Sequence, residues 1–101
     1  MPKKKIKYDK ELIEQQCLRS KEIGRITEPL GVFILARCND IAGAYFETEG
    51  SKELHQALVD EAVLRICEKF LYYYREGGSG ANLIISMAIS TMLNKIKSLA
   101  W

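Results

Sequence analysis

The sequence predicts an all-α protein, a compact bundle of about four helices. Apolar residues recur at spacings of three and four over four separate segments. Glycines and capping residues mark the boundaries between these segments. The chain of 101 residues is 48% hydrophobic and 28% charged, which suits one domain with its own hydrophobic core. We expect this domain to cover residues 8–101, after a basic tail at residues 1–7.

The first predicted helix covers residues 9–23. Asp9 is a candidate N-cap, because its carboxylate can accept a backbone N–H of the first turn. Gly24 is expected to end the helix, since glycine readily adopts the left-handed conformation of a C-terminal cap. The helix has an apolar stripe formed by Leu12, Ile13, Cys17 and Leu18.

The second predicted helix covers residues 27–48 and is apolar on most sides. Thr27 is a candidate N-cap, Glu28 suits the positive end of the helix dipole, and Pro29 needs no N–H in the first turn. Gly50 is expected to close this segment. A helix that is apolar on most sides lies in the centre of a core or in an interface.

The third and fourth predicted helices cover residues 51–74 and 81–99. Ser51 is the candidate N-cap of the third helix. The fourth contains neither glycine nor proline, and its expected buried face consists of Ile85, Ala88, Ile89, Met92, Ile96 and Leu99.

The glycine-rich stretch "REGGSG" is predicted to be a joint between these two helices. The sequence "GGSGAN" lacks the Lys-Ser/Thr pair of a P-loop, because Ala81 and Asn82 follow its last glycine. No βαβ unit surrounds it, as a dinucleotide fingerprint requires. A helix–helix connector is therefore favoured over a phosphate-binding loop.

Charge and cysteine usage narrow the class of protein. The net charge is +2. The basic tail either faces a polyanion or aids solubility. Its lysines are Lys3, Lys4, Lys5 and Lys7. Cys17, Cys38 and Cys67 are widely spaced and lack a neighbouring histidine, so we expect buried free thiols and neither disulfides nor zinc. No signal peptide or membrane span is indicated, which predicts a cytoplasmic protein with no membrane partner.

Catalytic residues are not indicated. His55 is the single histidine and stands near Glu53 on a charged helix face, without an obvious serine or cysteine nucleophile. The acids are scattered and form no isolated pair suited to acid–base chemistry. We therefore expect a protein that is not an enzyme and that uses no cofactor or metal.

The fourth predicted helix carries a stripe of small polar side chains. Ser86, Ser90 and Asn94 are spaced by four, Lys95 and Lys97 follow, and residues 81–101 contain no acid. Small hydrogen-bonding groups on a helix without acids suit close approach to nucleic acid. An ordinary solvated helix face is the alternative interpretation.

The order of features resembles region 2 of bacterial sigma factors. The segment "ALVDEAVLRICEKFLYYY", a short loop and "GANLIISMAISTMLNKIKSL" carry the resemblance. The chain is most similar to the divergent late sigma factors of T-even-like bacteriophages, which share a start like "YDKELIEQ", an apolar helix like "LGVFILARCNDIA" and an ending like "NKIK". The resemblance extends over most of the chain from Tyr8 onward.

The resemblance implies a transcription initiation factor that binds bacterial core RNA polymerase inside the host cell. The residues that would contact the β′ clamp helices include Asp60 and Glu61. The family usually has an acid at the position of Ala57, and here Gln56 would take its place. The resemblance also implies that one face of the fourth helix reads a −10-type promoter element. This face carries Ser86, Ser90 and Asn94. We assign Lys95 and Lys97, on the same helix, to contacts with DNA phosphates.

Two departures from the family keep other functions open. The family has aromatic residues that hold flipped bases, and here their positions carry Leu83, Ser86 and Met87. As the second departure, we expect no −35-reading domain after Trp101. Promoter opening by this protein alone is therefore not expected: either it needs a coactivator, or it binds core polymerase without opening DNA. The alternatives are a phage-type polymerase-binding regulator without promoter recognition, and a helical homo-oligomerising module that uses the apolar second helix.

Overall fold

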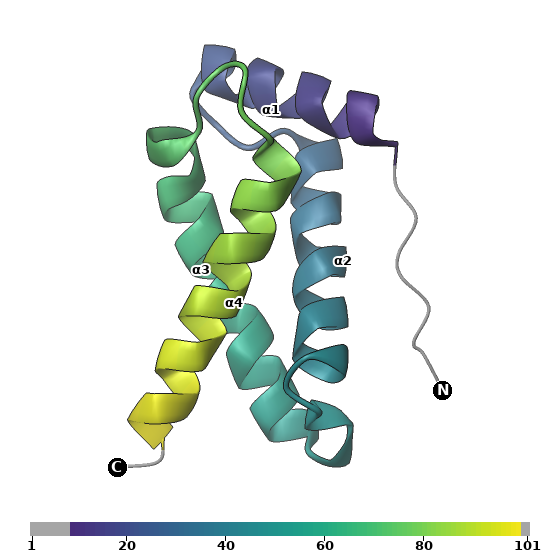
Figure 1. Ribbon diagram of the computed structural model, residues 1–101, viewed down its shortest axis with the longest axis vertical. Helices are drawn as coiled ribbons and strands as arrows, with labels where there is room; N and C mark the ends of the chain where they lie inside the picture. Colours follow the sequence, from purple (N-terminus) through teal and green to yellow (C-terminus); the bar gives the residue numbers. More distant parts are fainter. Residues whose placement is uncertain (1–8, 100–101) are drawn as a thin grey trace.

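The computed structural model describes residues 9–99, which form an all-helical bundle (Figure 1). Four α-helices follow one another along the chain: α1 (Lys10–Ile23), α2 (Glu28–Ala44), α3 (Lys52–Tyr73) and α4 (Gly80–Leu99). A short 3₁₀ helix, η1 (Thr48–Gly50), lies between α2 and α3. The all-α fold class is confirmed. The lysines of the predicted basic tail lie outside the described residues.

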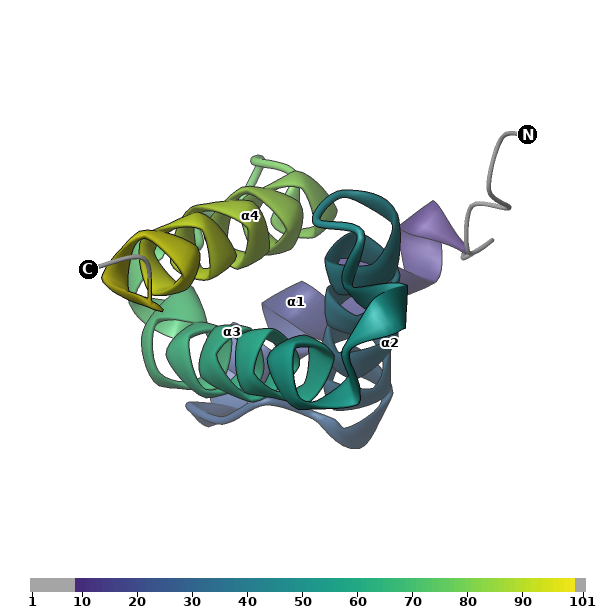
Figure 2. The same cartoon turned by 90° about the horizontal axis from the view of Figure 1, so that it is seen from below.

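Helices α2, α3 and α4 run alongside one another, and α1 lies across one end of them (Figures 1 and 2). The core lies between these helices and contains side chains from all four. Its largest fully buried side chains include Phe70, Leu30, Ile34, Leu58 and Ile66. In α3 the adjacent residues Leu58 and Val59 are buried, as a core-facing helix requires.

The helix ends use the local chemistry that the sequence predicts, with one exception. Asp9 accepts a hydrogen bond from the backbone of Leu12, and Ser51 caps α3 in the same way. Gly24 takes a left-handed φ of 79° and ends α1. Thr27 occupies the N-cap position of α2, but its hydroxyl accepts a hydrogen bond from Ser20 instead of capping the helix.

The predicted end of the second helix at residue 48 is wrong, because α2 ends at Ala44. Glu47 then turns the chain with a left-handed φ of 53°. Thr48 is buried, and its hydroxyl donates a 2.8 Å hydrogen bond to the carbonyl of Ala42. This contact folds the chain back on the end of α2, so residues 45–47 cannot continue the helix.

Burial corrects three further expectations. In α4 the predicted Ala88 and Met92 are fully buried, but so is Ile84, which was not predicted, whereas Leu99 is 58% exposed. Leu12 also lies at the surface, with 46% of its area exposed. Cys17 and Cys38 are buried free thiols, whereas Cys67 lies on the exposed side of α3.

The glycine-rich connection is anchored by α1. The carboxylate of Glu14 accepts hydrogen bonds from the backbone amides of Gly80 and Ala81, at 2.8 and 3.1 Å. These amides begin α4, and because they donate to Glu14 they are not free to bind a phosphate. Lys21 of α1 donates to the carbonyl of Leu71 near the end of α3. One helix therefore fixes both sides of the joint. The segment between Tyr73 and Gly80 connects α3 to α4, as predicted.

Candidate nucleic-acid interface

A groove lies between α3 and α4, the helix pair with the most extensive contact in the fold. It consists of two adjoining depressions of about 360 and 240 Å³, which share Arg65, Ser90 and Thr91. We call this feature the α3–α4 groove. Its lining residues are Glu61, Arg65, Tyr73, Ser86, Met87, Ser90, Thr91, Asn94, Lys95 and Ser98.

Helix α4 contributes the polar stripe that the sequence analysis singled out. Ser86, Ser90 and Asn94 recur every four residues, so they follow one side of the helix. All three are exposed and line the groove, while the buried stripe of α4 faces the core. Lys95 also lines the groove, whereas Lys97 is exposed and lies outside the lining.

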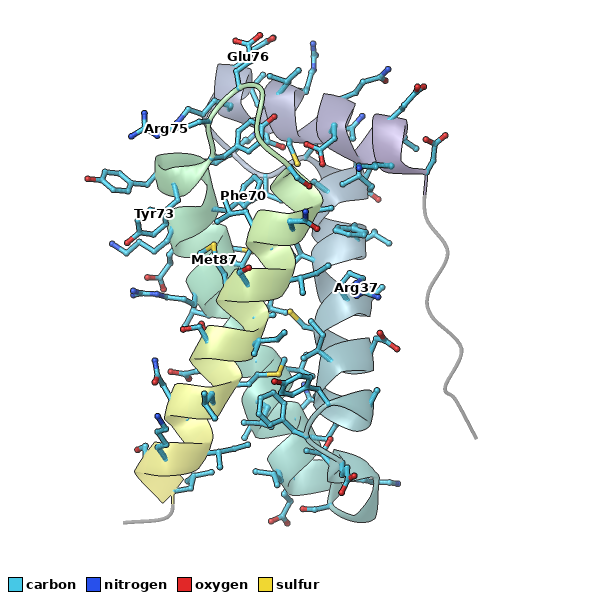
Figure 3. The ribbon with its side chains drawn as sticks, in the orientation of Figure 1. Arg37, Phe70, Tyr73, Arg75, Glu76 and Met87 are labelled. Carbon is cyan, nitrogen blue, oxygen red and sulfur yellow. The ribbon has the colours of Figure 1, made fainter. Side chains whose placement is uncertain are left out.

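Helix α3 supplies a cation and an aromatic ring to the opposite wall. Arg65 contributes to both depressions, and Tyr73 stands beside Ser86 and Met87 in the smaller one. In Figure 3, Tyr73 projects outward from α3 whereas Phe70 lies inside the bundle. Arg65 was not among the site residues predicted from the sequence. Arg65 lies four residues after Glu61, and residues four apart share a helix face. This spacing could have predicted that Arg65 lies beside Glu61.

The three consecutive tyrosines at and just after the end of α3 have different environments. Tyr74 is buried and stacks on Phe70 with ring centroids 5.3 Å apart, and burial raises the pKa of its hydroxyl. Tyr72 and Tyr73 are 80% and 49% exposed and meet edge to face, with ring centroids 5.2 Å apart. Tyr73 therefore offers a surface aromatic group to the groove.

The groove is more basic than acidic. Arg65 and Lys95 form no ion pair with any residue of the described segment, and Glu61 is the single acid in the lining. Free guanidinium and ammonium groups attract phosphate, and hydroxyl or amide groups can bond to phosphate or to base edges. Tyr73 has the flat apolar surface on which an unpaired base can stack.

All three residues predicted to bind polymerase are exposed on α3: Gln56, Asp60 and Glu61. Gln56 donates a 2.6 Å hydrogen bond to Asp60 along the exposed side of α3. Glu61 is turned about 100° from Asp60 around the helix and lines the groove instead. Leu64, one turn after Asp60, is 58% exposed. This leucine was absent from the predicted set.

His55 takes part in hydrogen bonds that connect elements of the fold. Its ring nitrogens contact Thr48 and Asn39, so it joins η1 and α2 to α3.

Within residues 9–99, no group of three or more His, Cys, Asp or Glu side chains is arranged to hold a metal ion. None of the described helices has the length and apolar character needed to cross a membrane.

Comparisons of this chain with protein-family models, curated proteins and solved structures find no match. Function is therefore inferred from the residues and their geometry.

Proposed function

We propose that this protein is a sigma-like transcription initiation factor. It binds bacterial core RNA polymerase through the exposed side of α3 and contacts a −10-type promoter element through the α3–α4 groove. The observation that carries this proposal is the composition of the groove. Two cations without ion-pair partners among the described residues stand beside hydroxyl and amide groups on an acid-free helix.

Affinity for DNA comes first from the cations. Arg65 lies where the two depressions join, and Lys95 lines the larger one, so a strand in the groove would pass both charges. Each phosphate neutralised by such a group releases counterions, which makes binding dependent on salt. Lys97 lies three residues beyond Asn94 and extends the positive charge along α4.

Contact with bases comes from the hydroxyl groups and the aromatic ring of the groove. Ser86 and Ser90 offer donors and acceptors to base edges or to the sugar–phosphate backbone. Tyr73 offers the stacking surface, in a chain whose fourth helix has no aromatic residue between Gly80 and Leu99. Tyr73 is the single aromatic residue in the lining of the groove. This is consistent with the expectation that the protein does not open promoter DNA unaided.

The polymerase-binding side of α3 combines polar and apolar groups. Gln56 and Asp60 form a hydrogen-bonded pair, and the exposed Leu64 follows one turn later. Such a surface suits the clamp helices of the β′ subunit, because an apolar anchor beside charged groups provides both affinity and orientation.

Size-exclusion chromatography with bacterial core RNA polymerase tests the proposal. We expect the wild-type protein to co-elute with the polymerase. A protein that elutes separately from its cognate polymerase contradicts the proposal. Binding to polymerase without added affinity for promoter DNA supports the regulator alternative instead.

Self-association is a second candidate function, and α2 favours it. Val32 and Leu35 lie three residues apart on this helix and are 63% and 50% exposed. An apolar pair on the outer side of a helix can pack against the same pair of a second copy. The solution mass of the isolated protein separates the two functions, since a tight homodimer favours the oligomerising module.

A further inference from the structure

The smaller depression of the α3–α4 groove lies near the point where α3 passes into α4. Tyr73 is the last residue of α3, and Ser86 and Met87 lie in the second turn of α4. A helix rises about 1.5 Å per residue, so Ser86 lies about 9 Å from Gly80 along the axis of α4. The width of this depression therefore depends on how the first turns of α4 are placed against the last turn of α3.

The connection between the two helices is anchored on its α3 side. Tyr74 is buried and stacks on Phe70, which belongs to α3. The next side chains, Arg75 and Glu76, are exposed and point away from the bundle (Figure 3). Gly77 follows with a left-handed φ of 91°. The α4 side of the connection is held by a different helix.

Helix α1, which lies across this end of the bundle, holds the beginning of α4 (Figure 1). The carboxylate of Glu14 accepts hydrogen bonds from the backbone nitrogens of Gly80 and Ala81, at 2.8 and 3.1 Å. On the α3 side, Lys21 donates to the carbonyl of Leu71. One helix outside the groove therefore contacts the backbone of both helices that form it.

The contact between α1 and α4 leaves little room for adjustment. A Cβ at residue 80 would lie 2.3 Å from the sulfur of Cys17, so the backbone of Gly80 rests directly on this buried side chain. Hydrogen bonds from a backbone amide weaken beyond about 3.2 Å. A small shift of α4 away from α1 therefore breaks the contacts of Glu14.

We propose that Glu14 is a positioning residue for DNA binding in the α3–α4 groove, a role that rests on the proposed function. Glu14 lies outside the lining of the groove. It acts through α4, because its hydrogen bonds hold the first turn of that helix where Ser86 and Tyr73 face the same strand. A groove that is formed before DNA arrives loses less conformational freedom on binding, and it therefore binds more tightly.

Charge alone predicts the opposite effect. Glu14 is an acid, so its removal makes the protein more positive and should strengthen the attraction of DNA. The positioning role predicts weaker binding after the same removal, because α4 loses its anchor. The sign of the change in affinity therefore separates the two effects.

The positioning role also predicts an effect in the reverse direction. Coupling between two sites is reciprocal, so bound DNA must favour the Glu14 contacts by the same factor by which these contacts favour DNA. The amides of Gly80 and Ala81 should then exchange more slowly with solvent when DNA is bound, although neither residue lines the groove. A residue that only adds to the stability of the fold would not produce this local change.

The first measurement is the affinity for promoter DNA of the complex with core RNA polymerase, by fluorescence anisotropy. Glu14→Ala should bind about fivefold more weakly than the wild type, the factor for about one hydrogen bond. Glu14→Gln retains one acceptor oxygen and should lose less. Glu11→Ala is the control for charge, since it removes an exposed acid from the same helix. Ser51→Ala is the control for stability, since it removes a side-chain cap at the far end of α3. Neither control should weaken binding.

The second measurement is hydrogen exchange of the same complex. Promoter DNA should slow the exchange of the Gly80 and Ala81 amides about fivefold in the wild type, and the Leu54 amide, which Ser51 caps, should not change. Equal affinity of Glu14→Ala and the wild type, or an equal loss in Ser51→Ala, would overturn the positioning role while DNA binding by the groove stands. A wild-type complex with no more affinity for promoter DNA than core polymerase alone would overturn the proposed function and the role of Glu14 together.

Discussion

The carboxylate of Glu14 lies 2.8 Å from the backbone nitrogen of Gly80, across 66 residues of sequence. Its second oxygen accepts from Ala81. A side chain of α1 therefore caps α4, where the glycine-rich connection ends. Because α4 supplies one wall of the groove, this cap fixes the position of the polar stripe relative to α3.

Replacement of Glu14 by alanine should lower the free energy of unfolding by about 1–2 kcal/mol, because two amides lose their acceptor and the helix dipole loses its counter-charge. Glu14→Gln keeps one acceptor oxygen and should cost less. Urea unfolding measures both variants. Gln15→Ala, at an exposed position of the same helix, should change stability by less than about 0.5 kcal/mol. Equal stability of all three variants would contradict the capping role.

Gly80→Ala should destabilise the protein, although alanine is usually the better helix former. A Cβ at residue 80 would lie 2.3 Å from the sulfur of Cys17. Overpacking of this kind costs about 1–3 kcal/mol. Gly31→Ala is the matched control, since its Cβ would meet a side chain at an ordinary 3.8 Å. In a Cys17→Ala background the cost of Gly80→Ala should shrink, and an unchanged cost would contradict this packing.

The three thiols should differ in reactivity. Burial raises the pKa of Cys17 and of Cys38 to about 12, so almost no thiolate is present at pH 8. Partial burial also raises the pKa of Cys67, but this thiol is accessible on α3. Iodoacetamide at pH 8 should therefore modify Cys67 first, as followed by mass spectrometry. In urea all three should react at similar rates. Rapid alkylation of folded Cys17 would contradict its burial.

Asp60 and Glu61 should have separable roles. Asp60→Lys should abolish co-elution with core polymerase, because it reverses a charge on the proposed binding side of α3. Glu61→Lys should leave co-elution intact and strengthen DNA binding, because it removes the acid from the groove. Circular dichroism confirms that both variants keep their helices. Loss of polymerase binding in both variants would show that the two residues act as one patch.

Helices were predictable where local sequence determines them. The caps at Asp9 and Ser51 and the stop at Gly24 depend on neighbouring residues, and the structure confirms them. The end of α2 depends on Thr48 bonding to Ala42 and on His55 from another helix. No local pattern encodes such contacts, so the predicted helix was too long.

The groove was predictable from one side only. A spacing of four placed Ser86, Ser90 and Asn94 on one side of α4 without knowledge of the fold. Which face of α3 meets that stripe depends on packing, so Arg65 and Tyr73 were not recognised as its partners. The same packing places Glu61 in the lining of the groove.

The most direct test of the central claim is the salt dependence of promoter DNA binding by the complex of this protein with core RNA polymerase. Fluorescence anisotropy is measured over a range of salt for the wild type, for Arg65→Glu with Lys95→Glu, and for the control Arg19→Glu with Lys10→Glu. The control makes the same charge change on the exposed surface of α1. We predict weaker binding and a salt slope reduced by about two in the groove variant alone. Equal affinity and slope in the wild type and the groove variant would contradict the assignment of the α3–α4 groove to DNA.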